Sequence, residues 1–206
     1  MYEYDGASGS ECYRTSDKLT GNATTSAGPT ITVSPTALTG FTYNQGSGPA
    51  ASQSYTLSAS NLTPAAGDLT VTGSANYEVS TDNSTFSGSV NVAYTGSTLG
   101  STTIYVRLKA GLSAGTYNSE AIANSGGGAA TKNVTCSGSV ALPTITVSPT
   151  SRTGFTYLQG SGPSSSQSYT LSATNLSPAA GDLTVTGSAN YEVSTDNSTF
   201  SGSVNV

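Results

Sequence analysis

Apolar and polar residues alternate along most of this chain, and a period of two residues predicts β-strands. In residues 103–109, Ile104, Val106 and Leu108 occupy every second position. The same type of pattern occurs in seven further segments, at residues 31–33, 54–59, 69–72, 76–80, 89–94, 116–123 and 133–140. Turn-forming residues separate the segments at intervals of about 8–12 residues, which is typical of antiparallel sheets. No segment shows the period of an amphipathic helix, so the pattern predicts an all-β chain.

An internal repeat organises these strands. Residues 29–92 and 143–206 align without a gap, and 57 of the 64 positions carry the same residue. The seven differing pairs are Ala37/Ser151, Leu38/Arg152, Asn44/Leu158, Ala50/Ser164, Ala51/Ser165, Ser60/Thr174 and Thr63/Ser177. One complete unit therefore spans residues 29–142, and the second copy, residues 143–206, reaches only the equivalent of Val92. Residues 1–28 lie outside the repeat.

The size of the unit indicates its fold. About eight strands in ~110 residues match an immunoglobulin-like domain, so we predict tandem immunoglobulin-like antiparallel β-sandwiches with an incomplete second copy. Ser and Thr make up 69 of the 206 residues, and hydrophobic residues make up 34%, below the usual ~45–50%. Thr on the solvated face of a strand supplies β-branching without apolar surface. The composition thus favours half-exposed strands over disorder.

The charged and catalytic residue types exclude several functions. The chain has no His, which excludes Ser-His-Asp and Cys-His catalytic sites and His-ligated zinc. Six basic residues and a net charge of −5 argue against nucleic-acid or anionic-membrane partners, which need clustered Lys and Arg. No apolar run approaches the ~20 residues of a membrane span. We therefore expect a protein that is not an enzyme and requires no cofactor.

Four aspartates are candidates for calcium ligands. Asp68 and Asp82 recur in the second copy as Asp182 and Asp196, and Ca²⁺ prefers several carboxylate and carbonyl oxygens. The chain has no Asp-x-Asp-x-Asp-Gly loop, however, and aspartates next to turns commonly accept hydrogen bonds from the local backbone. The sequence favours turn chemistry and leaves a weak calcium hypothesis open.

Tyrosines and cysteines provide two further candidate features. Tyr55, Tyr77, Tyr94 and Tyr105 are either half-buried strand residues or rings that stack on a sugar. The two cysteines of the chain are Cys12 and Cys136. They form a disulfide only if the segment before the repeat folds back onto the first copy. An interchain bridge and two free thiols are the alternatives.

Three motifs resemble a known repeat. They are Ile145–Thr150 (ITVSPT), Tyr77–Ser84 (YEVSTDNS) and, most specifically, Ile104–Tyr117 (IYVRLKAGLSAGTY). Together they resemble tandem Ig-like repeats of secreted and cell-surface multidomain proteins of Bacteroidota-type bacteria. The resemblance covers about residues 29–206 and implies export and display, either in adhesins or as spacers beside secreted nuclease or hydrolase domains. It names no ligand.

The incomplete second copy suggests how the chain is used. Open strand edges and an uncovered core need a partner, for which we consider two hypotheses. A neighbouring chain adds a strand, with residues 1–28 as the natural donor, and so builds a head-to-tail filament; alternatively, the chain is a window of a longer array of repeats. Either way we expect a non-enzymatic extracellular structural repeat of a bacterial surface fibre, filament or adhesin stalk. The alternative function is an accessory carbohydrate-binding or spacer module of a secreted hydrolase or nuclease, with a glycan or surface receptor as partner.

Overall fold

The computed structural model describes residues 27–206, which form an all-β structure. The first copy contains nine strands: β1 (Thr30–Ser34), β2 (Ala37–Asn44), β3 (Gln53–Ser60), β4 (Gly67–Thr72), β5 (Tyr77–Ser80), β6 (Ser89–Tyr94), β7 (Leu99–Leu108), β8 (Gly115–Gly126) and β9 (Ala129–Ala141). Each of the eight segments predicted from the alternation lies in or overlaps one of them. Within residues 27–206, no helix is long and apolar enough to span a membrane.

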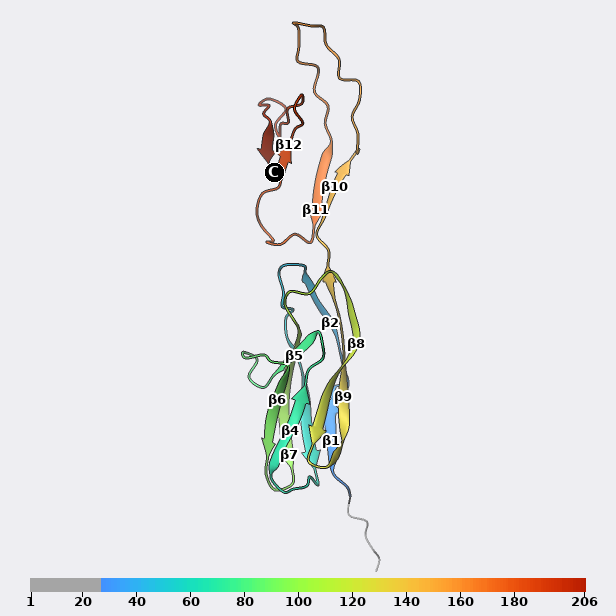
Figure 1. Cartoon of the computed structure of the whole chain (residues 1–206), viewed down its shortest axis with the longest axis vertical. Coiled ribbons are helices and arrows are strands. Elements are labelled where there is room, and N and C mark those ends of the chain that lie inside the picture. Colours follow the sequence, from blue (N-terminus) through green and yellow to red (C-terminus); the bar gives the residue numbers. More distant parts are fainter. Residues whose placement is uncertain (1–26) are drawn as a thin grey trace, which may run out of the picture.

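These strands form two sheets (Figure 1). One sheet has the order β1-β3-β7-β5, and the other has the order β2-β9-β8-β4-β6. Buried apolar side chains from both sheets form a single core between them. The interior strands are β3 and β7 in the first sheet and β9, β8 and β4 in the second. The late strands β7, β8 and β9 therefore lie between earlier ones.

Strand β2 was not predicted from the sequence. Its alternation is broken by an irregularity between Thr39 and Phe41, where Gly40 adopts a φ of 81° that favours glycine. Its partner is the distant strand β9, and this pair is parallel. The prediction of a wholly antiparallel arrangement is therefore wrong for this one pair.

Two tyrosine hydroxyls join the sheets across the core. Tyr55 on β3 donates to Asn124 Oδ1 on β8 at 2.7 Å, and both residues are buried. The Asn124 amide in turn donates to the Lys132 carbonyl at 3.0 Å. Tyr77 on β5 donates to the Tyr117 carbonyl on β8 at 2.8 Å. Because buried polar groups are costly unless paired, these bonds allow two large rings to occupy the core.

The second copy preserves two antiparallel strand pairs of the first. It contains four strands: β10 (Thr144–Ser148), β11 (Thr170–Thr174), β12 (Thr184–Thr186) and β13 (Ser203–Asn205). The β10–β11 pair has the register of β1–β3, and the β12–β13 pair has the register of β4–β6, each displaced by the repeat offset. These short pairs form without a closed core.

Inward-facing residues of the second copy are consequently exposed. Tyr55 is 2% exposed in the first copy, whereas its equivalent Tyr169 is 41% exposed. Tyr77 is 0% exposed, and its equivalent Tyr191 is 52% exposed. The sequence is the same in both places, so the difference comes from the strands that pack against it.

One substitution between the copies replaces an apolar core residue with a charged one. Leu38 on β2 is buried in the first copy. Its equivalent Arg152 is exposed, and the guanidinium donates to the carbonyl of Ser168. The second copy thus places a cation where the first has a core residue.

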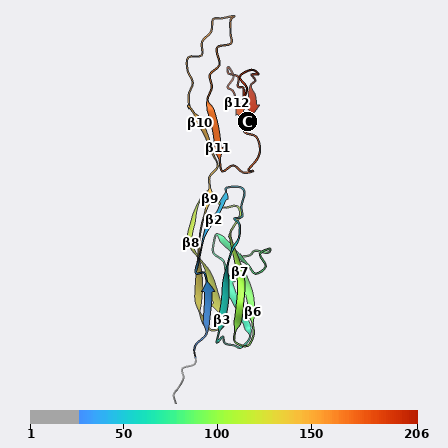
Figure 2. The same ribbon diagram turned by 180° about the vertical axis from the view of Figure 1, so that it is seen from behind.

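The two copies follow one another along the long axis of the molecule (Figure 1; seen from behind in Figure 2). The chain enters the first copy at one end, through β1, and leaves it at the opposite end, through β9 (Figure 1). Only Leu142 and Pro143 separate β9 from β10. The Asn175 side chain donates to the Leu142 carbonyl at 3.3 Å across this short connection.

The Tyr55 hydrogen bond predicts a difference between matched variants. In Tyr55→Phe, the buried Asn124 oxygen loses its donor, so we expect the free energy of unfolding of the first copy to fall by about 1–3 kcal/mol. The control Tyr169→Phe, at an exposed ring, should change it by less than about 0.5 kcal/mol. Urea unfolding followed by circular dichroism measures both, and equal effects would contradict the proposed role of this bond.

Candidate functional site

Asp82 is held in a tight turn by local hydrogen bonds. Its Oδ1 atom accepts the backbone N–H groups of Ser84 and Thr85 and the hydroxyl of Ser80, each at 2.8 Å. These bonds, led by the one from Thr85, lower the pKa of Asp82 to about 2. The same arrangement around Asp196 lowers its pKa to about 2 as well. The turn therefore uses one carboxylate oxygen in each copy, as the sequence favoured.

The other two calcium candidates lie on the neighbouring hairpins. Asp68 lies on β4 opposite Ala93, and Asp182 accepts a hydrogen bond from the Asn205 side chain at 3.4 Å. Across residues 27–206, no group of three or more Asp, Glu, Cys or His side chains is placed to hold a metal ion. The structure thus does not gather the four aspartates into one site.

The tyrosines of the first copy are largely core residues. Tyr55, Tyr77 and Tyr94 are buried, and Tyr105 is half-buried. Burial raises the pKa of Tyr55 and of Tyr77, while Tyr94 donates to the Pro64 carbonyl at 3.2 Å. The three buried rings offer no exposed face on which a sugar would stack.

Cys136 lies in the core on β9 and is 0% exposed. Burial, and then the nearby negative charge of Glu120, raise the pKa of the Cys136 thiol to about 12. Cys12 and most of the proposed donor segment, residues 1–26, lie outside the described residues, so the predicted disulfide and the donor strand both remain predictions.

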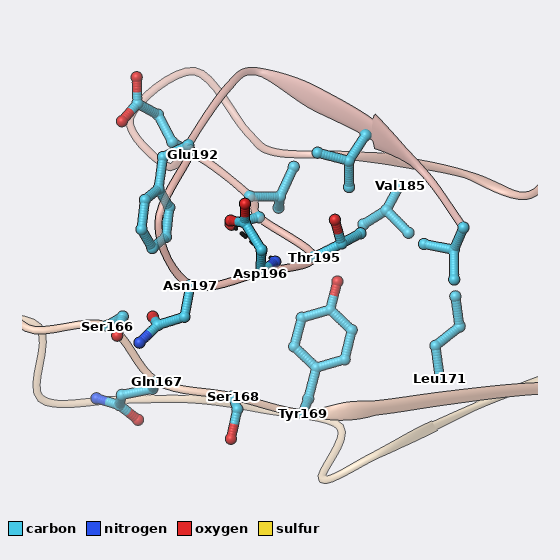
Figure 3. Close-up of a pocket in the computed structure, with 15 residues that line it drawn as sticks. Ser166, Gln167, Ser168, Tyr169, Leu171, Val185, Glu192, Thr195, Asp196 and Asn197 are labelled. Carbon is cyan, nitrogen blue, oxygen red and sulfur yellow. Dashed lines mark hydrogen bonds between the residues drawn. The ribbon is translucent and has the colours of Figure 1, made fainter.

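A concave surface lies in the second copy, where a groove of about 680 Å³ opens between two walls (Figure 3). One wall is residues 166–171, from which Tyr169 and Leu171 point toward the opposite wall. The opposite wall consists of residues 192–197 together with Val185 and the C-terminal hairpin. We call this the second-copy groove. Its lining mixes apolar side chains, such as Leu171 and Val185, with hydroxyl, amide and carboxylate groups.

Both walls present backbone that is paired in the first copy. There, β7 lies between β3 and β5 and forms hydrogen-bonded ladders with each. In the second copy, strand β11 begins only at Thr170, although β3 begins at the equivalent of Gln167. Residues 191–194, the equivalent of β5, keep only the bridge between Val193 and Ser201. Residues 167–169 and 191–194 of the second copy are therefore less regular than their counterparts in the first copy.

An ion pair between β7 and β5 occupies the corresponding position in the first copy. Arg107 on β7 donates from Nε to Glu78 Oε1 on β5 at 2.7 Å. The Arg107 guanidinium also lies 3.9 Å from the centroid of the Phe86 ring. The equivalents of Glu78 and Phe86 are Glu192 and Phe200, and both line the second-copy groove. This ion pair was not predicted from the sequence, although Glu78 and Arg107 carry opposite charges in two segments with regular alternation.

A scan of protein-family models and a search of curated proteins each found no match for this chain. The resemblance to Bacteroidota-type Ig-like repeats therefore stays a prediction.

The Asp82 turn predicts a specific pH dependence. A carboxylate whose pKa is lowered on folding stabilises the protein above its unfolded pKa of about 3.9, and that contribution is lost as the pH falls through the folded pKa of about 2. Asn at this position accepts hydrogen bonds without titrating. We expect Asp82→Asn to reduce the loss of stability between pH 4 and 2, measured by urea unfolding. Asp68→Asn is the control, and identical pH profiles for wild type and Asp82→Asn would contradict the turn assignment.

Burial of Cys136 predicts an inert thiol. In a Cys12→Ser variant, Ellman's reagent should react with the remaining thiol only after the protein is denatured, because the buried thiolate is both inaccessible and disfavoured. Fast reaction of the native variant would show that the core opens at β9. The same titration on the denatured wild type tests the disulfide, since a Cys12–Cys136 bridge leaves no thiol to react.

Proposed function

We propose that residues 29–206 form tandem Ig-like β-sandwich repeats and serve as a non-enzymatic structural element of an extracellular fibre or adhesin stalk. The observation that carries this proposal is the polarity of the first copy. The chain enters the first copy through β1 at one end and leaves it through β9 at the opposite end (Figure 1), and a nearly identical sequence begins two residues after β9 ends. Repeats linked in this way extend end to end and do not fold back on one another.

The first copy also supports the Ig-like assignment. Two sheets of four and five strands over a common core agree with a sandwich of about 100 residues. The two inter-sheet hydrogen bonds, Tyr55 to Asn124 and Tyr77 to Tyr117, fix the sheets relative to one another. A stiff unit of this kind suits a spacer.

The use of polar groups supports a structural role over a catalytic one. Asp82 accepts turn hydrogen bonds, Glu78 pairs with Arg107, and Glu120 accepts two hydrogen bonds from Asn76. These carboxylates serve the fold of the first copy and do not converge on a cleft. The richness in Ser and Thr and the scarcity of charge support an extracellular location.

Negative-stain microscopy of the purified full chain tests this function. We expect rod-shaped particles that associate end to end, with filament length increasing with protein concentration, because head-to-tail contacts do not close. Compact monomers at all concentrations that bind defined members of a glycan array would contradict the proposal and support a carbohydrate-binding module.

A further inference from the structure

We propose that the first copy associates side by side with a second copy of this chain through strand β6, whose outer edge pairs with the same edge of its partner. The six residues Ser89–Tyr94 form an antiparallel contact about a two-fold axis, which joins two five-stranded sheets into one. We call this row of residues the β6 edge. The contact lies on the flank of the first copy, whereas the proposed fibre role concerns its ends, so neither proposal rests on the other.

The β6 edge is open among the described residues. Strand β6 ends the five-stranded sheet and pairs with β4, and both ribbon views place it at the margin of the first copy (Figures 1 and 2). Within residues 27–206, no strand is paired with its other side. Because β6 lies in the complete first copy, this edge is open independently of the second copy.

The phase of the β4–β6 ladder identifies the free backbone groups. Gly73 donates to the Gly88 carbonyl at 2.8 Å, and hydrogen-bonded pairs alternate along an antiparallel ladder. The even-numbered residues of β6 therefore turn their N–H and C=O groups toward β4, and the odd-numbered residues turn theirs outward. The Ser89 carbonyl already accepts a side-chain hydroxyl at 2.5 Å. Asn91 and Ala93 thus offer their N–H and C=O groups to a partner strand.

The other three edge strands of the first copy carry features that hinder pairing. Natural edge strands are commonly protected by proline, charge, irregularity or short length. Strand β1 lies between Pro29 and Pro35, β2 is interrupted near Gly40, and β5 has four residues, one of them Glu78. Strand β6 has no proline, no charged residue and no register shift in its pairing with β4. It is therefore the edge of the first copy best suited to accept a strand.

The sequence of β6 is complementary to itself, which selects a second copy as the occupant. A two-fold axis at Val92 places this residue opposite the partner's Val92. Asn91 and the partner's Ala93 then exchange two backbone hydrogen bonds, and the symmetry supplies two more. Val90 lies opposite the partner's Tyr94, so apolar residues of the core side meet apolar residues. No like charges face one another, because the strand has none.

Sedimentation velocity of the full chain tests this association, in a Cys12→Ser background that prevents disulfide exchange through that thiol. One pair of short strands forms a smaller contact than the ~1,200–2,000 Å² of stable complexes, so we expect reversible dimers at concentrations up to about 0.5 mM. Ala93→Lys should weaken dimerisation at least about tenfold, because lysine on an edge strand opposes pairing. The folded copy accepts this lysine, since Asp68 lies opposite Ala93 on β4.

Thr56→Lys is the matched control. Thr56 is exposed on β3, which is paired on both sides, and its substitution changes the net charge by the same amount as Ala93→Lys. Dimerisation of Thr56→Lys should stay within about twofold of the parent chain. End-to-end contacts would respond alike in the two variants, so their difference reports the β6 edge. Equal dimerisation of the two variants, or a monomeric parent chain over the whole range, would overturn the proposal.

A proline substitution separates edge pairing from folding. The N–H group of Ala93 points away from β4, so Ala93→Pro removes an outward donor and leaves the β4–β6 ladder intact, as proline on edge strands commonly does. We expect at least about tenfold weaker dimerisation with an unchanged urea midpoint of the first copy. Ala93→Ser, which keeps the N–H group, should dimerise like the parent chain. Equal dimerisation of a folded Ala93→Pro and Ala93→Ser would show that the edge hydrogen bonds are not used.

Directed crosslinking tests the register. Across the proposed contact, the two Val92 residues form a non-hydrogen-bonded pair with Cα atoms about 4.5 Å apart, which a disulfide can span. Mild oxidation of Val92→Cys, again with Cys12→Ser, should therefore give a covalent dimer on non-reducing gels. Val90→Cys is the control, because Val90 is more exposed than Val92 but lies opposite the partner's Tyr94. Stronger crosslinking through Val90→Cys would contradict the two-fold pairing. Loss of end-to-end filaments in the microscopy would leave these results unchanged, so the two proposals can fail independently.

Discussion

The two-sided pairing of β7 holds the first sheet of the first copy together. Strand β5 joins that sheet only through β7, and the β1–β3 pair lies on the other side. The three inward side chains of β7 are each fully buried in the core. A strand that comes late in the unit therefore determines whether earlier segments form a continuous sheet or separate hairpins. In the second copy, the counterparts of β1 and β3 form one strand pair and the counterparts of β4 and β6 form another, separate pair.

The remaining polar groups are arranged around this constraint. Tyrosine hydroxyls bridge the sheets where the core would otherwise bury unpaired atoms, and Asp82 orders the turn that follows β5. Each of these groups satisfies neighbouring backbone or side chains of the first copy. A module built in this way can be copied with few changes, because these polar groups find their partners within one copy.

The sequence predicted the strands with a regular alternation and the turn role of Asp82, because these depend on local pattern and local hydrogen bonding. It did not predict β2, whose alternation is interrupted near Gly40 and whose partner is the distant strand β9. The second-copy groove was not predicted from the sequence. Its lining combines residues from three separated segments, which only the folded chain brings together.

The parallel β2–β9 pair has a mechanical consequence. Tension applied to the two ends of the first copy would pull β2 and β9 past one another along their length, since β2, which follows the entry strand β1, runs parallel to the exit strand β9. Seven residue pairs share that load at once, whereas a hairpin peeled from its end would lose its bonds one after another. The unit is thus oriented to resist shear along the axis on which the copies are joined, and the short Leu142–Pro143 connection passes that force directly to the next copy.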